Sequence, residues 1–457
     1  MLTSILRKSN AWCFRRASCL SLKANRGLAS YVAEQVTFPD HPPLPLALPS
    51  VGKKKIQLLT RSNIPEIFAT RAPHLPATDY LAAASVFPMR ANNYVVEELI
   101  DWSRVPDDPI FKLVFPQPDM LEPDQLHAVR SAIERGASKS ELRDLAAQFT
   151  AVGSDQQFQS KDVTQLVDYL KANRDVTDIL FTGGDPMVMH TQQFARYVDA
   201  LLSSPGTENL ATIRIGSKSL SYWPYRYLTD PDAGEMLKLF EKIVKSGRHL
   251  SIMAHFSHPV ELQGVAVQEA MRRIRATGAN IRCQAPLIRQ VNDQPHIWAD
   301  MWRTQTRLGA IPYYMFVERD TGAKHYFEVP LARAFDIYRE AISSVAGTAR
   351  TVQGPSMSAS PGKIQVVGIT TINTPSGPEK VFILRFLQAR NPAWMKETFF
   401  AKFDEKASWL NDLKPAFGEK EFFYEKEYRE LVKREGASGQ LFPASDSMKY
   451  RNRIRPF

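Results

Sequence analysis

The sequence predicts an α/β fold built on a parallel sheet. After residue 160, five short apolar segments alternate with longer segments whose apolar residues recur at helical spacing. Strands separated by helices are joined by crossover connections, which make neighbouring strands parallel. The 457 residues suffice for one large domain with appendages or for two domains. We therefore expect an open parallel sheet or a partial (β/α) barrel.

The expected strands and helices alternate along the chain. The segment Asp178–Thr182 is short and apolar, which is typical of a buried strand. No run approaches the roughly 18 to 20 apolar residues of a membrane span. The expected strands are 178–182, 212–215, 249–254, 280–286 and 311–316, and the expected helices are 161–174, 194–202, 234–245, 260–276, 296–308 and 331–344.

The region before this series is expected to be an arm followed by helices. Residues 34–60 contain five prolines, which favours an extended arm. Residues 61–107 have a helical pattern, and 122–134 reads as a helix closed by a glycine. Ser138–Glu141 is a capping-box pattern that opens a further helix over 141–149.

The region after the series is expected to be a hairpin and an appendage. Residues 364–371 and 380–386 are expected strands, joined by the turn-forming segment Asn373–Gly377. Residues 387–430 are rich in Phe, Trp and Lys, and 436–457 is expected to be a tail. These features divide the chain into 1–33, 34–150, 151–363 and 364–457.

The first 33 residues have the composition of a mitochondrial transit peptide. They contain six basic residues, no acidic residue and many Ser, Leu and Ala. Without these six charges the net charge falls from +10 to +4, spread without a basic block, which argues against a nucleic-acid-binding protein. A disordered basic tail is the alternative interpretation. We expect the mature protein in the mitochondrial matrix, where disulfides are not expected.

Side chains suited to chemistry gather in the loops that follow the five strands. The carboxyl ends of parallel strands meet at one rim, which is where barrels place their active sites. Glycines, imidazoles, guanidiniums and carboxylates therefore converge there. The loops are Thr182–Pro186, Arg214–Lys218, His255–Pro259, Gln284–Asp293 and Glu318–Asp320.

Each polar group in these loops has a functional and a structural interpretation. Gly183 and Gly184 allow the backbone to approach a ligand, and Asp185 could bind an amine, but an ordinary tight turn has the same composition. His255 and His258 could bind a metal, although loop histidines that bond to the backbone are more common.

Three basic residues are further candidates. Arg214 and Arg289 could hold a carboxylate or a phosphate, or each could form a surface ion pair. Lys363 follows the small-residue segment Ser356–Gly362. A desolvated lysine there could form a Schiff base with pyridoxal phosphate, although a lysine in such a loop is usually solvated.

Taken in order, these segments resemble the lysine 2,3-aminomutase family of radical S-adenosylmethionine enzymes. The resemblance covers about 175–368, with a weaker similarity at 108–116. Residues 387–420, for instance Leu387–Trp394, are similar to a eukaryotic mitochondrial branch of the family. The matching segments are Asp178–Pro186, Arg214–Lys218, His255–Pro259, Gln284–Asp293, Pro312–Tyr314 with His325, and Pro361–Lys363.

The resemblance implies a partial (β/α) barrel of the radical S-adenosylmethionine type. S-adenosylmethionine is expected at a rim formed by Gly183, Gly184, Asp185, Arg214 and Gln284. In the family, a [4Fe–4S] cluster on a Cys-x3-Cys-x2-Cys loop cleaves S-adenosylmethionine reductively. The resulting 5′-deoxyadenosyl radical abstracts a substrate hydrogen, and pyridoxal phosphate carries the amino group between adjacent carbons.

The same resemblance implies roles for two further residues. Pyridoxal phosphate is expected on Lys363, which makes this lysine the catalytic candidate, and Asp320 is expected to bind the amine of an amino-acid substrate. A homo-oligomer is compatible with the sequence.

The sequence departs from the family where the cluster belongs. Of three cysteines, Cys13 and Cys19 lie in the expected transit peptide, so Cys283 alone remains. The interval that should hold the cysteine loop and the first barrel strand is a few dozen residues too short, with a seam expected near Gln148–Val152. One thiolate holds no [4Fe–4S] cluster, so we expect no metal site and no aminomutase activity. Loss of the first strand would also expose its neighbour's edge.

A second departure concerns the substrate. The glycine-rich loop before the lysine is shortened, and only Ser358 or Ser360 stands where the family has its amine-binding aspartate, which makes lysine a doubtful substrate. The favoured hypothesis is an aminomutase-family chain that has lost its cluster segment. The alternative is a cluster-free scaffold or sensor that binds S-adenosylmethionine or pyridoxal phosphate. A third hypothesis, pyridoxal chemistry without radicals, lacks an identifiable base.

Overall fold

The computed structural model describes residues 50–149, 163–318 and 323–438. The expected transit peptide, most of the seam and Asp320 lie outside these residues. The chain divides into two units, Met1–Pro49 and Ser50–Phe457, and every element described below belongs to the second. None of the described helices is both long and apolar enough to cross a membrane.

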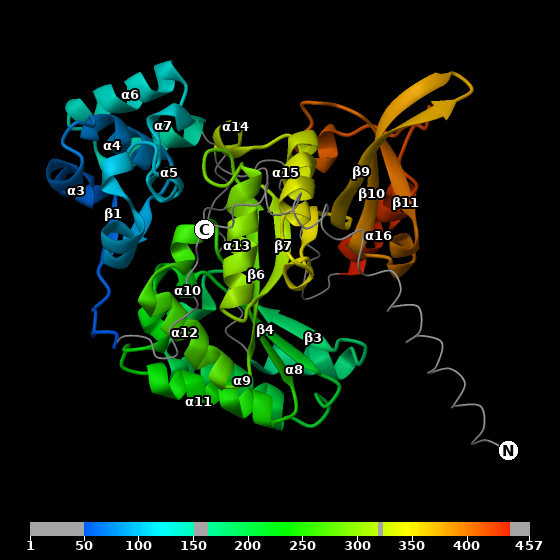
Figure 1. The fold of residues 1–457 in the computed structure, drawn as a ribbon, viewed down its shortest axis with the longest axis horizontal. Coiled ribbons are helices and arrows are strands. Elements are labelled where there is room, and N and C mark those ends of the chain that lie inside the picture. The colour runs from blue at the N-terminus through cyan, green and yellow to red at the C-terminus, as the bar shows by residue number, and fades with distance from the viewer. Residues whose placement is uncertain (1–49, 150–162, 319–322, 439–457) are drawn as a thin grey trace, which may run out of the picture. The chain divides into compact units, whose positions relative to one another are not determined.

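A nine-stranded sheet forms the centre of this unit (Figure 1). Its strands lie in the order β11-β10-β9-β8-β7-β6-β5-β4-β3, so the order in the sheet follows the order in the chain. Strands β3 to β8 are parallel, and β8 to β11 pair antiparallel. The strands are β3 (Asp178–Phe181), β4 (Thr212–Ser217), β5 (His249–His255), β6 (Asn280–Leu287), β7 (Ile311–Val317), β8 (Gln353–Ala359), β9 (Gly362–Thr374), β10 (Gly377–Ala389) and β11 (Thr398–Lys402).

The predicted alternation of strands and helices is confirmed. All five expected strands form, and each expected helix is present with its ends displaced by a few residues. The structure therefore has an α/β fold with a mostly parallel sheet. The helices of the series are α8 (Val163–Ala172), α9 (Thr191–Ser203), α10 (Ser219–Tyr222), α11 (Ala233–Lys245), α12 (Val265–Ala276), α13 (Pro295–Arg307), α14 (Lys324–Phe327) and α15 (Leu331–Ser343).

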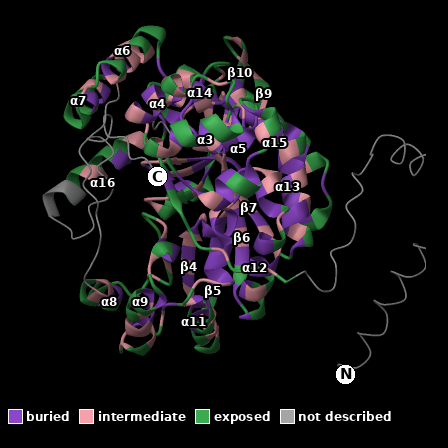
Figure 2. Cartoon of the chain, turned by 90° about the vertical axis from the view of Figure 1, so that its left-hand side faces the viewer, coloured by how far each residue is buried: buried purple, intermediate pink, exposed green. Residues whose placement is uncertain are grey.

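One face of the sheet packs against helices. Helices α11, α12, α13 and α15 contact β5, β6, β7 and β8 respectively. Ala285 and Leu287 of β6 and Met315 of β7 pack in one core cluster with Trp298 of α13 and Ile337 of α15. Buried residues accordingly concentrate in the central strands (Figure 2).

The opposite face of the sheet carries the polar residues of the same strands. Side chains alternate between the two faces of a strand, so the neighbours of the core residues point away from the helices. We call this the inner face. The residues on it that matter below are Arg214, Arg282, Gln284, Tyr314, Phe316, Ser356, Ser358 and Lys363, all half-buried except Ser356, which is buried.

The expectation that Asp178–Thr182 is a buried strand is wrong. Strand β3 pairs only with β4 and forms the end of the sheet within the described part of the chain. Leu180, on the inner face of β3, is 42% exposed, and Asp178 is also exposed. An apolar residue on an open strand edge is a liability that proteins usually cover.

The C-terminal hairpin is confirmed, and it continues the central sheet. Strands β9 and β10 pair antiparallel, with Gly377 opposite Thr374 across the predicted turn. The unpredicted β11 adds to β10. Aromatic residues of 394–424 pack in one cluster with Leu331 of α15 and with the strands, and helix α16 (Glu425–Ser438) follows.

The N-terminal region differs from its prediction in one respect. Residues 61–107 do not form one helical stretch, because Arg90–Asn92 (β2) pairs antiparallel with Leu58–Thr60 (β1). The predicted capping box is confirmed: the Glu141 amide donates to Ser138 Oγ at 3.2 Å, and the Ser138 amide donates to Glu141 Oε2 at 2.7 Å. The helices are α3 (Ile64–Arg71), α4 (Ala77–Val86), α5 (Pro109–Val114), α6 (Pro123–Glu134) and α7 (Lys139–Phe149).

Candidate functional site

The loops singled out in the sequence meet at the carboxyl ends of the parallel strands. In the strand register, Ser217 of β4 lies opposite Ala254 of β5, and His255 lies opposite Gln284 of β6. Gln284 in turn lies opposite Tyr314 of β7. The structure therefore brings the β4, β5, β6 and β7 loops to one rim, as the parallel topology predicts.

Asp185 connects the first two loops of the rim. Its carboxylate accepts hydrogen bonds from the Ser217 hydroxyl at 2.8 and 2.9 Å, the Lys218 amide at 2.8 Å and the Met187 amide at 2.9 Å. A carboxylate has about four acceptor positions, and these bonds occupy most of them. In this structure Asp185 orders the rim itself.

The two glycines before Asp185 provide an open stretch of backbone. Gly183 and Gly184 have φ angles of 87° and 62°, and a Cβ atom at either position would meet no atom within 4 Å. The left-handed backbone favours glycine here. The empty space beside both residues leaves their peptide groups accessible to a ligand.

A buried polar network supports the rim from behind. Lys218 forms an ion pair with Glu261 at 3.1 Å, and the Glu261 side chain is fully buried. Lys218 Nζ also lies 3.3 Å from Ser257 Oγ, which is 3.1 Å from His255 Nε2. Burial, and secondly Lys218, hold the pKa of His255 well below its usual value, so this imidazole is neutral.

Two sequence candidates have structural roles. The Nδ1 atom of His258 accepts a hydrogen bond from the Val260 amide at 3.4 Å, which is the structural interpretation of this loop histidine. Arg289 binds backbone carbonyls, among them that of Tyr326 at 2.9 Å. Within the described residues, no group of three or more His, Cys, Asp or Glu side chains has the arrangement of a metal site.

Lys363 lies on an aromatic surface of the inner face. Its Nζ is 4.0 Å from the ring centre of Tyr314 and 4.9 Å from that of Phe316, and these two rings stack 5.0 Å apart. Lys363 forms no hydrogen bond or ion pair with a described residue. Burial, and secondly Arg214, lower its pKa from 10.5 to about 8. The sequence placed Lys363 in a loop, whereas it is the second residue of β9 and lies opposite Ser358.

Arg214 lies on the inner face of β4 and forms an ion pair with Asp178 at 2.7 Å. Its charge lowers the pKa of Lys363 and opposes the rise in the pKa of Tyr314 that burial causes. Through these two pKa effects Arg214 acts on the lysine end of the inner face, while Ser217 of the same strand bonds to Asp185 of the rim.

Cys283 faces the helices and is 2% exposed. Burial raises its pKa well above the usual value of a thiol, so this residue is a poor source of thiolate.

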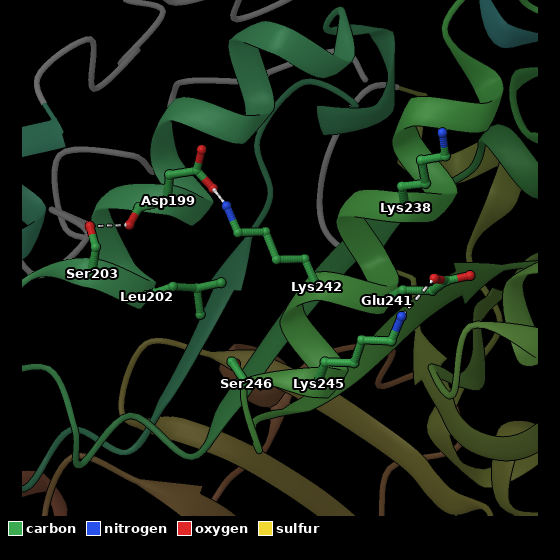
Figure 3. A pocket seen from close by; sticks show the side chains of 8 residues that line it. All are labelled: Asp199, Leu202, Ser203, Lys238, Glu241, Lys242, Lys245 and Ser246. Carbon is green, nitrogen blue, oxygen red and sulfur yellow. Dashed lines mark hydrogen bonds and ion pairs between the residues drawn. The ribbon is translucent and has the colours of Figure 1, made fainter.

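A surface groove of about 850 Å³ between α9 and α11 is remote from the rim, because it lies at the carboxyl ends of these helices (Figure 3). Four of its five charged groups are paired, as Lys242–Asp199 and Lys245–Glu241, and Lys238 is the fifth.

Sequence reasoning missed three parts of the site: the pairing of Lys218 with Glu261, the aromatic surface under Lys363, and Arg282. The period of two along β6 and β7 would have placed Arg282, Gln284, Tyr314 and Phe316 on one face. Only the position of β9 beside β8 brings Lys363 to that face, and the Ser-rich β8 gave no strand signal.

Comparison with known proteins indicates the relatives of this chain. No family model matches. The chain is 26% identical to a protein of Aquifex aeolicus provisionally named an L-lysine 2,3-aminomutase, over 79% of this chain and 96% of that protein. It resembles 2,3-aminomutases. It is 25% identical both to an L-lysine 2,3-aminomutase of Methanococcus maripaludis and to a glutamate 2,3-aminomutase of Clostridioides difficile. These two matches span only 41% and 39% of the relatives' lengths.

Proposed function

We infer that this chain is an aminomutase-like protein that retains a ligand-binding inner face and lacks the means to start radical chemistry. It would hold pyridoxal phosphate through Lys363 and S-adenosylmethionine at the Gly183–Asp185 rim of a partial (β/α) barrel. The observation that carries the proposal is the environment of Lys363, a lysine with a pKa of about 8 that lies on an aromatic surface and pairs with no acid among the described residues.

The residues around Lys363 fit pyridoxal phosphate. A lysine must be neutral to add to an aldehyde, and a pKa of about 8 keeps a substantial fraction neutral near pH 7.5 to 8. Tyr314 and Phe316 offer an apolar surface beside the amine, and Arg214 adds positive charge nearby. When bound, pyridoxal phosphate supplies an electron-withdrawing ring that stabilises charge or spin next to the amino group.

The rim residues fit a small polar ligand such as S-adenosylmethionine. The peptide groups of Gly183 and Gly184 are open, and Gln284 lies at the same rim, on the inner face of β6 opposite His255 of β5. Asp185, Ser217 and Lys218 hold the rim in place through their mutual hydrogen bonds.

The residues of this chain do not fit a [4Fe–4S] cluster. Cys283 faces the helices, and no second cysteine follows residue 19. In the alignment with the Aquifex protein, 79% of 457 residues is about 361, so about 20 of the 381 aligned positions have no residue in this chain, as expected of a chain shortened relative to that protein. Among the described residues β3 has a neighbour on one side only, which is consistent with the loss of a strand on the other.

A titration with pyridoxal phosphate tests the retained ligand site. We expect the absorbance band of a protonated Schiff base in the wild-type protein and its loss in Lys363→Met. Lys380→Met is the matched control, because Lys380 also lies on an aromatic ring, 3.6 Å from the centre of Phe403, but is exposed. Equal bands in wild-type protein and Lys363→Met would remove the basis of the proposal.

Anaerobic reconstitution with iron and sulfide tests the lost cluster. We expect substoichiometric iron, no charge-transfer absorbance and no turnover of lysine or glutamate with S-adenosylmethionine and a reductant. About four irons per chain, together with turnover, would show that the chain finds cluster ligands elsewhere.

The alternative function is a ligand-responsive scaffold or sensor. The aromatic environment of Lys363 and the open Gly183–Gly184 backbone favour it, since both persist without a cluster. A rise in melting temperature with S-adenosylmethionine or pyridoxal phosphate is expected, and no rise with either would exclude a sensor of these ligands.

The basic composition of residues 1–33 leads us to place the protein in the mitochondrial matrix. A fluorescent fusion of residues 1–49 that stayed outside mitochondria would contradict this localisation.

A further inference from the structure

Arg282 is a second unpaired cation on the inner face. It lies on β6 between the core residues Ile281 and Cys283, so its side chain points away from the helices. Its guanidinium lies 5.0 Å from the ring centre of Tyr313. It forms no hydrogen bond or ion pair with a described residue. A half-buried guanidinium without an acceptor is unusual, because its five N–H donors seek partners.

Arg282 and Lys363 flank the same aromatic cluster. The ring centres of Tyr313 and Tyr314 are 4.2 Å apart, and Lys363 Nζ lies 4.0 Å from that of Tyr314. Together with the 5.0 Å contact of Arg282, these distances place the two cations no more than about 13 Å apart. Since both cations are carried on long side chains, this upper limit is within the reach of one ligand of the length of pyridoxal phosphate, and a shorter ligand requires the side chains to move together.

Charge on the inner face is one-sided among the described residues of the strands. Arg214, Arg282 and Lys363 are basic, whereas the acid in contact with them is Asp178, which already pairs with Arg214. Two unpaired cations on one aromatic surface are complementary to a ligand that is anionic at one end and carries a carbonyl at the other.

We propose that Arg282 binds the anionic group, phosphate or carboxylate, of the carbonyl compound that reacts with Lys363. The neutral Nζ of Lys363 adds to the carbonyl carbon, a carbon–nitrogen double bond forms, and the carbonyl oxygen leaves as water with the two hydrogens of the amine. Arg282 takes no part in these bond changes. It orients the ligand through two N–H groups. This inference rests on the proposed role of Lys363.

Pairs of carbonyl compounds with and without the anionic group test the proposal on the full chain. Pyridoxal 5′-phosphate is compared with pyridoxal, and glyoxylate with acetaldehyde, by borohydride reduction and mass spectrometry of the peptide that contains Lys363. Wild-type protein, Arg282→Gln, Arg282→Lys and Arg196→Gln are compared. Arg196 is exposed on the outer helix α9 and serves as the matched control.

We expect Arg282→Gln to weaken the apparent affinity for the anionic partner about tenfold or more, with little change for its neutral partner. Arg282→Lys should recover part of the loss, and Arg196→Gln should behave as wild type. Loss confined to pyridoxal phosphate identifies a phosphate as the bound anion, and loss confined to glyoxylate identifies a carboxylate.

Two results overturn the proposal and differ from each other. If Lys363 is labelled but Arg282→Gln keeps the full preference for both anionic compounds, Arg282 is not the anion-binding residue, while the proposed function stands. If Lys363 is labelled by none of the four compounds, both the inference and the proposed role of Lys363 fall. Circular dichroism of Arg282→Gln separates either result from misfolding, and Arg282→Lys repeats the comparison if Arg282→Gln is unfolded.

Discussion

Lys363 on β9 contacts Tyr314 on β7 across the intervening strand β8, with 4.0 Å between the ammonium nitrogen and the ring centre. Lys363 can reach this ring because the side chains of β8 on the inner face, Ser356 and Ser358, are small. Met357 between them packs into the core on the other face. Small side chains on β8 thus let a lysine reach an aromatic ring two strands away. The amine is desolvated there without gaining an acid as a partner.

The first prediction concerns the reactivity of Lys363. Since burial and Arg214 lower its pKa to about 8, the rate of acylation of Lys363 by a small reagent should reach half its maximum near pH 8. Exposed lysines should follow the usual value near 10.5. Arg214→Gln should move the midpoint upward, because a neighbouring positive charge is removed. Peptide mapping of the acylated protein at a series of pH values measures the pH of half-maximal labelling of Lys363. A value of about 10 or above would contradict the buried environment of this lysine.

The second prediction concerns stability against pH. The folded-state pKa of Lys363 is about 8 and the unfolded value is 10.5, so the folded protein binds fewer protons in this window. The free energy of unfolding should therefore rise as the pH increases from 8 to 10.5, by up to roughly 2 kcal/mol. Below pH 8 the charged lysine destabilises the fold. Lys363→Met should be more stable than wild type at pH 7 and lack this rise. Urea unfolding of both proteins between pH 7 and 10.5 measures the free energy of unfolding. The prediction fails if the free energies of wild type and Lys363→Met change with pH in parallel.

The third prediction concerns the network behind the rim. Glu261 is fully buried, pairs with Lys218 and accepts from the Ser257 amide. Glu261→Gln should lower the free energy of unfolding by roughly 3 kcal/mol, because it leaves Lys218 buried without its counterion. Glu241→Gln breaks the exposed pair with Lys245 and should change it by less than about 1 kcal/mol. Equal effects in denaturant titrations would mean that Glu261 has no special role.

The fourth prediction concerns the glycine pair of the rim. Gly184→Ala should destabilise by roughly 1 kcal/mol, because φ is 62° and alanine resists this conformation, although its Cβ meets no atom. Gly234→Ala in α11 meets no atom either and has an ordinary helical backbone, so it should be neutral or stabilising. Thermal unfolding compares the two. A Gly184→Ala variant as stable as Gly234→Ala would show that the turn tolerates a side chain.

The sequence predicted the alternating series well because each strand and helix has its own apolar pattern. Helices α9, α11 and α13 begin and end within a few residues of their expected bounds. The pattern failed at β8, where Gly354, Pro355 and two serines hide a strand that exists only because β7 and β9 lie on either side. It also failed at β3, since apolar composition does not tell a central strand from an edge strand.

The sequence was sufficient to predict which loops form the candidate site. It was not sufficient to predict which side chains of these loops interact with one another. Parallel topology predicts one rim for these loops, and the described ends of β4, β5, β6 and β7 lie side by side there. That Asp185 is occupied by Ser217 and Lys218, and that Arg214 acts on Lys363, depends on side-chain geometry that spacing does not encode. Asp320 lies outside the described residues, and its role as a substrate partner stays a prediction.

The proposed ligand site on the inner face is tested most directly by mapping where pyridoxal phosphate attaches along the whole chain. The protein is treated with a small excess of the ligand near pH 8, reduced with borohydride, digested and analysed by mass spectrometry. We expect the modification mainly on Lys363, at well above the labelling of Lys380 and of the other exposed lysines. Labelling spread evenly over surface lysines, with Lys363 unmodified, would contradict the central claim that the inner face retains a ligand site.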